Sequence, residues 1–518
     1  MKNESCMEKL MQRLSDAAAE LRIPALSAVL SGLAAYMFCF VNKLEIMDDL
    51  SCMFGQGASL SSGRWGLDIA QYFMPTFSVP WLNGIISLLL ITATICIVVK
   101  MFRIRNPLLR LLLPALLMTF PTQTCTFGYM FTAPQYALAL LMAIGAADLF
   151  ASSAEGKCLD TKKTAAGGIL LILSLSFYQS YVAVTASYLV VYVITVTLKG
   201  ERSAKDTLRC GLILAAEIIG SMLLYYGLTA VIQKLWKAEM NGYAEGNLNG
   251  FADVLFGIRV AYTSFIGYFY KGYYDLASNP ASKAAHILVA VLIVSAAFLH
   301  IANGKKKEEK GKRTLLLALC LFLLPPAVNS IRIISSLFHN LMLFSFTSVY
   351  ILAASVLEIC GETIQKKLAF LWKDAVYVCM IITVACNIYF SNCIYYKMYL
   401  QLNQAESFYT SVISALMQDE KFTVDSPVAF IGSSDVLYDI PMIYTGNLAG
   451  IRDGIVGTYS QEEFIKTFLG VKMNVCDWDV TDILETDSRV IEMPSYPSYG
   501  SIRNIDGIYV VRLGNIGE

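Results

Sequence analysis

The sequence predicts an all-α polytopic membrane bundle of about eleven transmembrane helices, followed by a small α/β domain outside the cytoplasm. Of the 518 residues, 56% are hydrophobic and only 15% are charged, whereas soluble domains carry about 25% charged residues. Stretches with almost no charge, such as 81–99, 210–229 and 315–328, recur at intervals that match the thickness of a bilayer. The chain is therefore expected to cross a membrane many times.

Clusters of lysine and arginine alternate with segments that carry few of either, and this alternation sets the predicted topology. By the positive-inside rule, the N-terminus and the basic clusters near residues 100–105, 157–163, 199–209, 305–313 and 366–373 face the cytoplasm. The predicted spans lie near 23–41, 81–99, 107–120, 132–150, 166–180, 182–198, 210–230, 283–303, 314–329, 338–359 and 375–391.

The stretch 166–198 allows either one long bent helix or two helices. Its length of about 33 largely apolar residues exceeds one ordinary span, and Tyr178, Gln179 and Ser180 near the midpoint suit a reversal of the chain. Both flanks are basic, which favours two helices. An odd number of spans then places the C-terminus outside the cell.

Residues 1–391 form the predicted transmembrane domain, with outer loops at 42–80 and 231–282, and residues 392–518 form the predicted extracytoplasmic domain. The second outer loop is rich in aromatic residues, which are typical of an interfacial belt. In the C-terminal domain we expect strands at 428–432, 489–492 and 508–513 and a helix at 461–469.

Composition also excludes several classes of function. The net charge of +0 gives no basic field for a nucleic acid partner. Thirteen scattered cysteines and three histidines form no metal-binding spacing, so we predict no metal and no other cofactor. No cleavable signal peptide and no phosphate-binding glycine loop are evident. An activated substrate must then come through the membrane or from outside.

The adjacent acids Asp48 and Asp49 follow the first span and should lie near the outer membrane boundary, where buried charge is costly. A carboxylate there can act as a general base toward an acceptor hydroxyl. Because adjacent residues point apart, one would do the chemistry while the other orients it. The alternative is that the pair caps a short amphipathic helix.

Five polar or aromatic residues in the outer segments, and one acid within a span, are further candidates. Arg64 can bind a phosphate, and Trp65 can stack on a sugar or anchor in the headgroups. Tyr178 and Gln179 could line a cavity or simply form a turn between helices. Arg332, just outside the ninth span, could bind a lipid phosphate or reach the headgroups by snorkelling. Glu217 lies within the seventh span as a structural group or part of an ion path.

Three stretches carry a resemblance to a known family: Met47-Asp48-Asp49 with Ser62-Gly63-Arg64-Trp65, Ser176 to Tyr181, and Ile491 to Pro497 with Gly500-Ser501-Ile502. On these, the chain resembles the multi-spanning bacterial glucosyltransferases that decorate O-antigen and related surface polymers, within the GT-C class of membrane glycosyltransferases. The resemblance spreads over nearly the whole chain.

The resemblance implies a GT-C-like bundle in the bacterial plasma membrane and a glucose or related sugar donor linked to undecaprenyl phosphate, a polyprenyl-phosphate carrier. It also implies a surface glycan acceptor on the outer face, Asp48 or Asp49 as the catalytic residue, and Arg64 near the carrier phosphate. Some members of the class use a divalent metal and others do not.

Two other functions remain open at this level. A lipid or polysaccharide transporter would need a polar path, for which Glu217 is the candidate acid. A non-catalytic envelope assembly protein would use its outer domain for docking and would not need Asp48 or Asp49.

Overall fold

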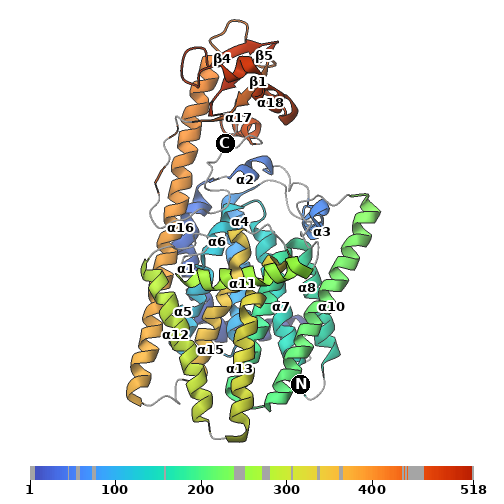
Figure 1. Cartoon of the computed structure of the whole chain (residues 1–518), viewed down its shortest axis with the longest axis vertical. Helices are drawn as coiled ribbons and strands as arrows, with labels where there is room; N and C mark the ends of the chain where they lie inside the picture. Colours follow the sequence, from blue (N-terminus) through green and yellow to red (C-terminus); the bar gives the residue numbers. More distant parts are fainter. Residues whose placement is uncertain are drawn as a thin grey trace.

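The computed structural model describes residues 6–44, 46–53, 59–72, 78–156, 159–238, 251–270, 280–304, 307–334, 339–360, 366–434, 437, 440–441 and 460–515. Side chains are described from residue 20 onward. Within these ranges a helical bundle forms the lower part of the molecule and a small sheet domain forms its upper end (Figure 1).

The long helices follow the apolar stretches of the sequence. They are α1 (Cys6–Val41), α4 (Pro80–Met101), α5 (Pro107–Met118), α6 (Pro121–Gly128), α7 (Ala133–Ser153), α8 (Thr161–Phe177), α9 (Val182–Lys199), α10 (Ala204–Trp236), α11 (Phe251–Tyr270), α12 (Pro280–Asn303), α13 (Lys307–Val328), α15 (Ser348–Cys360) and α16 (Lys366–Leu416). Short elements join them: α2 (Met47–Ser51), η1 (Leu60–Ser62), α3 (Trp65–Ala70), η2 (Gln179–Tyr181), α14 (Ser330–Ile334) and η4 (Asn340–Thr347).

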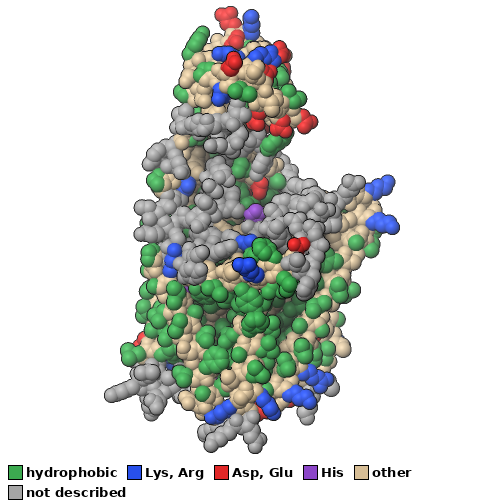
Figure 2. All heavy atoms as spheres, in the orientation of Figure 1, with side chains coloured by type: hydrophobic (Ala, Val, Ile, Leu, Met, Phe, Trp, Pro, Cys, Tyr) green, Lys and Arg blue, Asp and Glu red, His purple; other side chains and the backbone are tan. Residues whose placement is uncertain are grey.

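The polytopic bundle predicted from hydropathy is confirmed. Among the described residues, nine helices are long and apolar enough to cross a membrane, and the pair α5–α6, bent by 41°, makes up to ten. The remaining predicted span, 166–180, corresponds to α8, whose 17 residues lie at the short end of the range for a membrane helix. Hydrophobic side chains cover the bundle between its two ends (Figure 2).

The chain reverses between α8 and α9, as the two-helix interpretation of 166–198 predicts. Lys163 Nζ donates to the Ser152 carbonyl at 3.4 Å, and Arg202 Nη1 donates to the Ala154 carbonyl at 2.8 Å. Both ends of this helical pair therefore return to the C-terminal end of α7. The turn lies at Tyr178, whose extended backbone (φ −154°, ψ 102°) ends α8.

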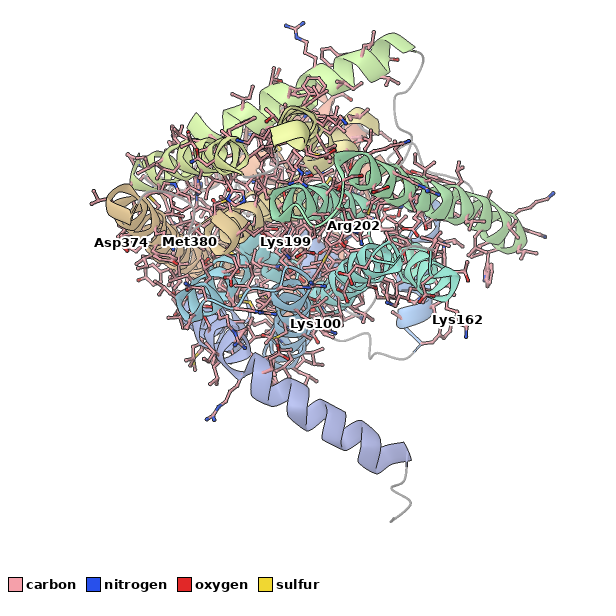
Figure 3. The ribbon with its side chains drawn as sticks, turned by 90° about the horizontal axis from the view of Figure 1, so that it is seen from below. Lys100, Lys162, Lys199, Arg202, Asp374 and Met380 are labelled. Atoms are coloured by element: carbon pink, nitrogen blue, oxygen red, sulfur yellow. The ribbon has the colours of Figure 1, made fainter. Side chains whose placement is uncertain are left out.

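The predicted basic clusters gather at one end of the bundle, which we call the basic end. Figure 3, which views the molecule from below, shows Lys100, Lys162, Lys199 and Arg202 together at this end. The C-terminal domain lies at the opposite end (Figure 1), which we call the outer end after the predicted topology. The two ends thus differ in charge in the way that the positive-inside rule requires of a membrane protein.

The second outer segment, 231–282, contains structure that the prediction of a loop missed. Its central part is the 20-residue helix α11, which runs across the bundle near the outer end (Figure 1). Tyr262, Phe265 and Tyr268 recur at helical spacing and pack inward, with Tyr268 stacked on His286 at 5.4 Å between ring centroids. The aromatic content of this segment hid its helical period.

The small α/β domain predicted at the C-terminus is present. Its elements are β1 (Pro427–Ile431), β2 (Ser433–Ser434), α17 (Gln461–Thr467), β3 (Asn474–Val475), α18 (Trp478–Glu485), α19 (Ser488–Ile491), β4 (Ile502–Ile505), β5 (Ile508–Arg512) and β6 (Gly514–Asn515). Among the described residues, the main sheet has the order β3-β1-β5-β4, with β1 and β5 parallel and β4 and β5 antiparallel.

One predicted strand in this domain is wrong. Residues 489–492 were expected to be extended, but Ser488–Ile491 form the short helix α19. The Asp487 side chain accepts a hydrogen bond from the Arg489 backbone N–H and so caps the helix start. A four-residue run with two apolar members cannot distinguish a strand from one helical turn.

The C-terminal domain has two hydrophobic layers, one on each face of the sheet. Val428 and Phe430 of β1 point into a layer shared with α16 and α17, whereas Ala429 and Ile431 point into a layer shared with α18 and α19. Helix α16 has 51 residues, about 75 Å of helix, so it extends well beyond a hydrocarbon core of about 30 Å. The predicted domain boundary after residue 391 falls inside this helix and stays a prediction.

Candidate functional site

The two aspartates lie on the short helix α2, and their side chains diverge as adjacent helical residues must. Asp49 is fully buried, and its Oδ1 accepts a hydrogen bond from the Phe131 backbone N–H at 2.9 Å. Phe131 lies between α6 and α7. Asp48 is partly exposed. Asp49 therefore attaches α2 to the bundle, while Asp48 faces the space beside it.

Arg64 is held by aromatic residues from two other parts of the chain. Its Nη1 donates to the Tyr136 hydroxyl at 3.3 Å, and its guanidinium carbon lies 5.8 Å from the centroid of the Tyr178 ring. Tyr136 and Tyr178 stack on each other with centroids 4.6 Å apart. This pair of rings fixes one side of the guanidinium group through a hydrogen bond and a cation–π contact.

Helix α10 fixes the turn that carries Arg64. Gly63 has a φ of +78°, which favours glycine, and its carbonyl accepts from the Tyr225 hydroxyl at 3.0 Å. The buried Trp65 donates from Nε1 to Thr229 Oγ1 at 3.1 Å, and Gln233 Nε2 donates to the Leu60 carbonyl at 3.1 Å. The three α10 residues recur every four positions, so one face of the helix holds the whole turn.

Gln179 joins the same network from the α8–α9 turn. Its Nε2 donates to the Ser62 carbonyl at 2.8 Å and to the Tyr225 hydroxyl at 3.1 Å. Tyr178 and Gln179 thus act together, one beneath the Arg64 side chain and the other on its backbone turn. The structure brings these two predicted residues to Arg64, and it places Trp65 in the supporting network.

His339, which sequence reasoning passed over, lies near enough to Arg64 and Asp48 for both charges to affect it. It precedes η4, which contacts α6 and η2. Burial and the nearby positive charge of Arg64 lower the pKa of His339 below its usual value, and the negative charge of Asp48 opposes this shift. We call Asp48, Arg64 and His339 together the outer cluster.

Tyr129 lies beside the same carboxylates. Burial raises its pKa well above the usual value, and the charges of Asp48 and Asp49 add to the shift. Tyr129 lies within the segment 121–132 that the predicted topology places outside, and Tyr136 follows it closely, which is a signal that could have suggested them. His339 gave a weaker signal, since a lone histidine at the start of a span matches no motif.

Arg332 lies on α14, which packs against α11 and contacts α9. Gly257 of α11 permits this packing, because a Cβ at that position would lie 2.8 Å from Ile333 Cα. Arg332 therefore lies near α11 and α9, on the short helix that follows α13. Its participation in phosphate binding stays a prediction.

Glu217, the acid considered for an ion path, is bound by its neighbours. Its Oε1 accepts from Thr164 Oγ1 at 2.7 Å and from Ser153 Oγ at 3.2 Å. These bonds join α7, α8 and α10 near the basic end. They are typical of the polar contacts that connect membrane helices.

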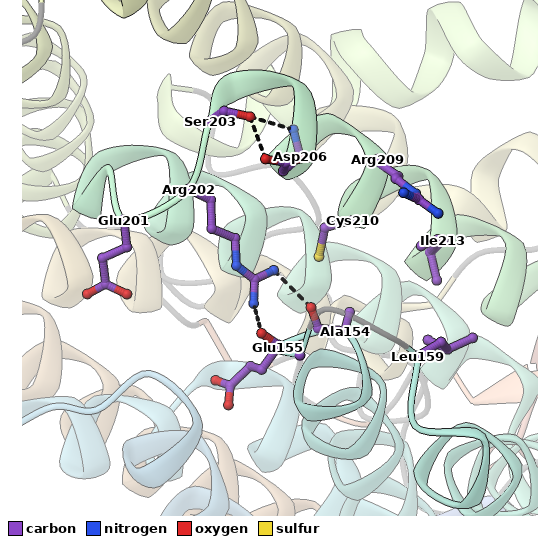
Figure 4. Close-up of a pocket in the computed structure, with 11 residues that line it drawn as sticks. Ala154, Glu155, Leu159, Glu201, Arg202, Ser203, Asp206, Arg209, Cys210 and Ile213 are labelled. Carbon is purple, nitrogen blue, oxygen red and sulfur yellow. Dashed lines mark hydrogen bonds between the residues drawn. The ribbon is translucent and has the colours of Figure 1, made fainter.

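A pocket at the basic end also contains charged residues, but its Arg202 binds backbone carbonyls and not aromatic side chains. It has a volume of about 710 Å³ and is lined by residues that include Glu155, Glu201, Arg202, Asp206 and Arg209 (Figure 4). Arg202 points its guanidinium group at the Ala154 and Glu155 carbonyls. None of the predicted site residues lines this pocket as described.

The composition of the outer cluster suits transfer chemistry at a phosphate ester. It combines a carboxylate, a guanidinium group fixed by aromatic rings, and an imidazole. Within the described residues, no group of three or more His, Cys, Asp or Glu side chains is arranged to hold a metal ion.

A family comparison identifies the class of protein. The model of the family described as "Glucosyl transferase GtrII" matches residues 37–357, which is more than half of the chain. The chain belongs to this family. The resemblance to O-antigen-type glucosyltransferases is thereby confirmed. No curated protein and no solved structure matches the chain in the other two comparisons.

The range matched to the GtrII family includes the outer cluster and every predicted site residue from Asp48 to Arg332. It ends before α16, so the third stretch of resemblance, near Ile491 to Pro497, lies outside it. The chain is thus a membrane protein of a glucosyltransferase family whose candidate site lies within the matched part. The C-terminal domain must be interpreted from its structure.

Proposed function

We propose that this protein transfers glucose or a closely related sugar from a polyprenyl-phosphate carrier to a surface glycan acceptor outside the bacterial plasma membrane. The observation that carries the proposal is the position of Arg64, which Tyr136 and Tyr178 hold at the end of the bundle opposite the basic clusters. Its charge and that of Asp48 both act on His339. By the positive-inside rule the basic end faces the cytoplasm, so this cluster and the C-terminal domain face outward.

A lipid-linked donor suits the position of Arg64. The guanidinium group lies at the outer end of apolar helices, where the phosphate of a lipid would be and where its prenyl tail could lie along the bundle. The sequence has no phosphate-binding glycine loop for a nucleotide sugar. We assign the carrier phosphate to Arg64, with Arg332 as a second cationic group.

Asp48 is the proposed general base. It accepts the proton of the acceptor hydroxyl while the hydroxyl oxygen forms a bond to the anomeric carbon. The bond from that carbon to the carrier phosphate breaks, and its electron pair leaves on the lipid phosphate. Arg64 stabilises the charge that develops there. Asp49 is not the base in this proposal, because its buried carboxylate already binds the Phe131 N–H.

The other predicted site residues have supporting roles in this proposal. Tyr178 lies beneath the Arg64 guanidinium group, and Gln179 and Trp65 hold its turn in place. The aromatic and amide groups therefore set the direction of the guanidinium group toward the carrier phosphate. The C-terminal domain, at the outer end beyond α2, binds or positions the acceptor glycan.

Reconstituted protein provides the test. Proteoliposomes with purified protein receive either polyprenyl-phosphate-linked glucose or a soluble nucleotide-linked glucose, together with surface glycan as acceptor. We expect sugar transfer from the lipid-linked donor alone. Transfer from the nucleotide sugar, or movement of lipid across the bilayer without any glycosidic product, would contradict the proposal and favour another donor or a transporter.

A further inference from the structure

The helix that carries the aspartates is too short to hold its own orientation. Helix α2 has five residues, whereas isolated helices shorter than about 12–15 residues are marginal in water. Its N-terminal residue Ile46 provides no side-chain cap. The direction of Asp48 must therefore be set by what packs around α2.

One side of α2 is attached to the membrane bundle. The buried Asp49 binds the Phe131 N–H, and Leu44 and Ile46 belong to the hydrophobic core of the bundle. This attachment fixes one edge of a helix of little more than one turn. It leaves the rotation of α2 about that edge to be set by its opposite side.

The opposite side of α2 lies in the hydrophobic core of the C-terminal domain. Leu50 and Met53 are both 0% exposed, and they belong to the same buried layer as Phe408 of α16 and Phe464 and Ile465 of α17. Helix α17 contacts α2 directly. A segment of the first outer loop thus completes the core of a domain that follows it by more than three hundred residues.

Lys43 adds a polar contact on the same side. Its Nζ lies 5.9 Å from the centroid of the Phe468 ring at the end of α17 and 3.6 Å from the Met53 sulfur. The ammonium group of Lys43 thus connects the segment that follows α2 with the end of α17, and it strengthens the same junction.

We propose that the C-terminal domain is a positioning element for the proposed base: the layer formed by Leu50, Met53 and Phe464 holds α2 so that Asp48 is directed toward the reacting groups beside Arg64. This inference rests on the proposed function, since it assumes that Asp48 takes the acceptor proton. Leu50 and Phe464 are positioning residues, because they act through α2. A displacement of about 1 Å at a reacting group can lower a rate by about 100-fold.

The two faces of the sheet provide a matched control. Leu484 of α18 is a buried leucine like Leu50, but it belongs to the layer on the far face of the sheet. Truncation at Leu484 removes the same atoms from the same domain without touching the layer that contains α2. Leu50→Met keeps the volume of the side chain and is the conservative variant.

The test measures kcat and KM for sugar transfer in full-length Leu50→Ala, Phe464→Ala, Leu50→Met, Leu484→Ala and Asp48→Asn, each normalised to folded protein. We expect Leu50→Ala and Phe464→Ala to lower kcat by about 10- to 100-fold with little change in the donor KM. Leu50→Met should retain most activity, and Leu484→Ala should retain the wild-type kcat per folded molecule.

Two outcomes would overturn the inference without affecting the proposed function. One is a wild-type kcat in both folded alanine variants while Asp48→Asn is inactive. The other is an equal loss in Phe464→Ala and Leu484→Ala, which would mean that activity follows the stability of the domain as a whole. If Leu50→Ala does not fold, the kcat of Phe464→Ala is compared with that of Leu484→Ala, and a lower value in Phe464→Ala alone supports the inference. Full activity in Asp48→Asn would instead refute the proposed function.

Discussion

Arginine side chains at the two ends of the bundle are used in opposite ways. At the basic end, Arg202 donates to the Ala154 and Glu155 carbonyls just after α7 (Figure 4). Arg313 Nη2 donates to the Gly200 carbonyl at 3.0 Å where α9 ends. At the outer end, Arg64 is held by the rings of Tyr136 and Tyr178, and its charge acts on His339. The first arrangement caps helices, and the second suits binding of an anion.

This difference shows that the groups bound to an arginine indicate its role better than the presence of an arginine does. Arg202 donates its hydrogen bonds to the Ala154 and Glu155 carbonyls within the protein. Tyrosine rings orient Arg64, whose guanidinium group suits a phosphate in the proposed function. Matched substitutions at the two ends should therefore change different properties of the protein.

The largest expected difference between the ends concerns Arg64. Arg64→Ala should lower kcat for sugar transfer by about 100- to 1,000-fold, because the charge on the leaving phosphate loses its stabilising partner. The same measurement on Arg202→Ala, per folded molecule, should give the wild-type rate. An equal loss of kcat in Arg64→Ala and Arg202→Ala would contradict the assignment of the site to the outer end.

The free energy of unfolding should instead depend on the arginine at the basic end. Arg202→Ala removes hydrogen bonds that cap α7, and should lower the free energy of unfolding by about 1–3 kcal/mol. Arg209, exposed in the same pocket, provides the control, since Arg209→Ala removes a charge without removing a described hydrogen bond. Denaturant unfolding in detergent measures both. A stability loss in Arg209→Ala as large as in Arg202→Ala would show that charge, and not capping, matters at this end.

A smaller effect should come from the network that holds the Arg64 turn. Tyr225→Phe removes the hydroxyl that bonds the Gly63 carbonyl and Gln179. At about 1 kcal/mol for each of these two hydrogen bonds, kcat should fall by about 30-fold. Tyr226→Phe removes the hydroxyl of the neighbouring, half-exposed ring and should leave kcat unchanged. The comparison fails if the two variants have the same rate.

The smallest effect is a dependence of stability on pH. Because the pKa of His339 is lowered in the folded protein, the unfolded chain binds this proton first as the pH falls. Stability from this group is therefore complete above about pH 6.5 and declines as the pH falls toward the lowered value. Thermal unfolding between pH 5 and pH 8 should show a shallower decline in His339→Gln than in wild type. A decline of the same slope in both would mean that His339 does not report on the outer cluster.

Hydropathy and charge alternation predicted most of the bundle, because membrane spans depend on local composition. They also predicted the reversal at Tyr178, since both flanks of that stretch are basic. The local reading failed at α11, where aromatic residues concealed a helical period, and at α19, which is too short to show any period.

The candidate site could be predicted only in part, because its members come from distant segments. Asp48 and Arg64 were evident as charges near the membrane boundary. The approach of His339 to both, and the packing of Leu50 into the C-terminal domain, depend on tertiary contacts between segments far apart in the sequence. The sequence contains the residues for these contacts, but no local pattern predicts that they meet.

Sugar transfer by Asp48→Asn tests the central claim most directly. The rate is measured with polyprenyl-phosphate-linked glucose in proteoliposomes, beside wild type and Glu201→Gln, which changes an exposed acid at the basic end. The account predicts a loss of about 100- to 10,000-fold in kcat for Asp48→Asn, and the wild-type rate for Glu201→Gln. A wild-type rate in correctly folded Asp48→Asn would contradict it.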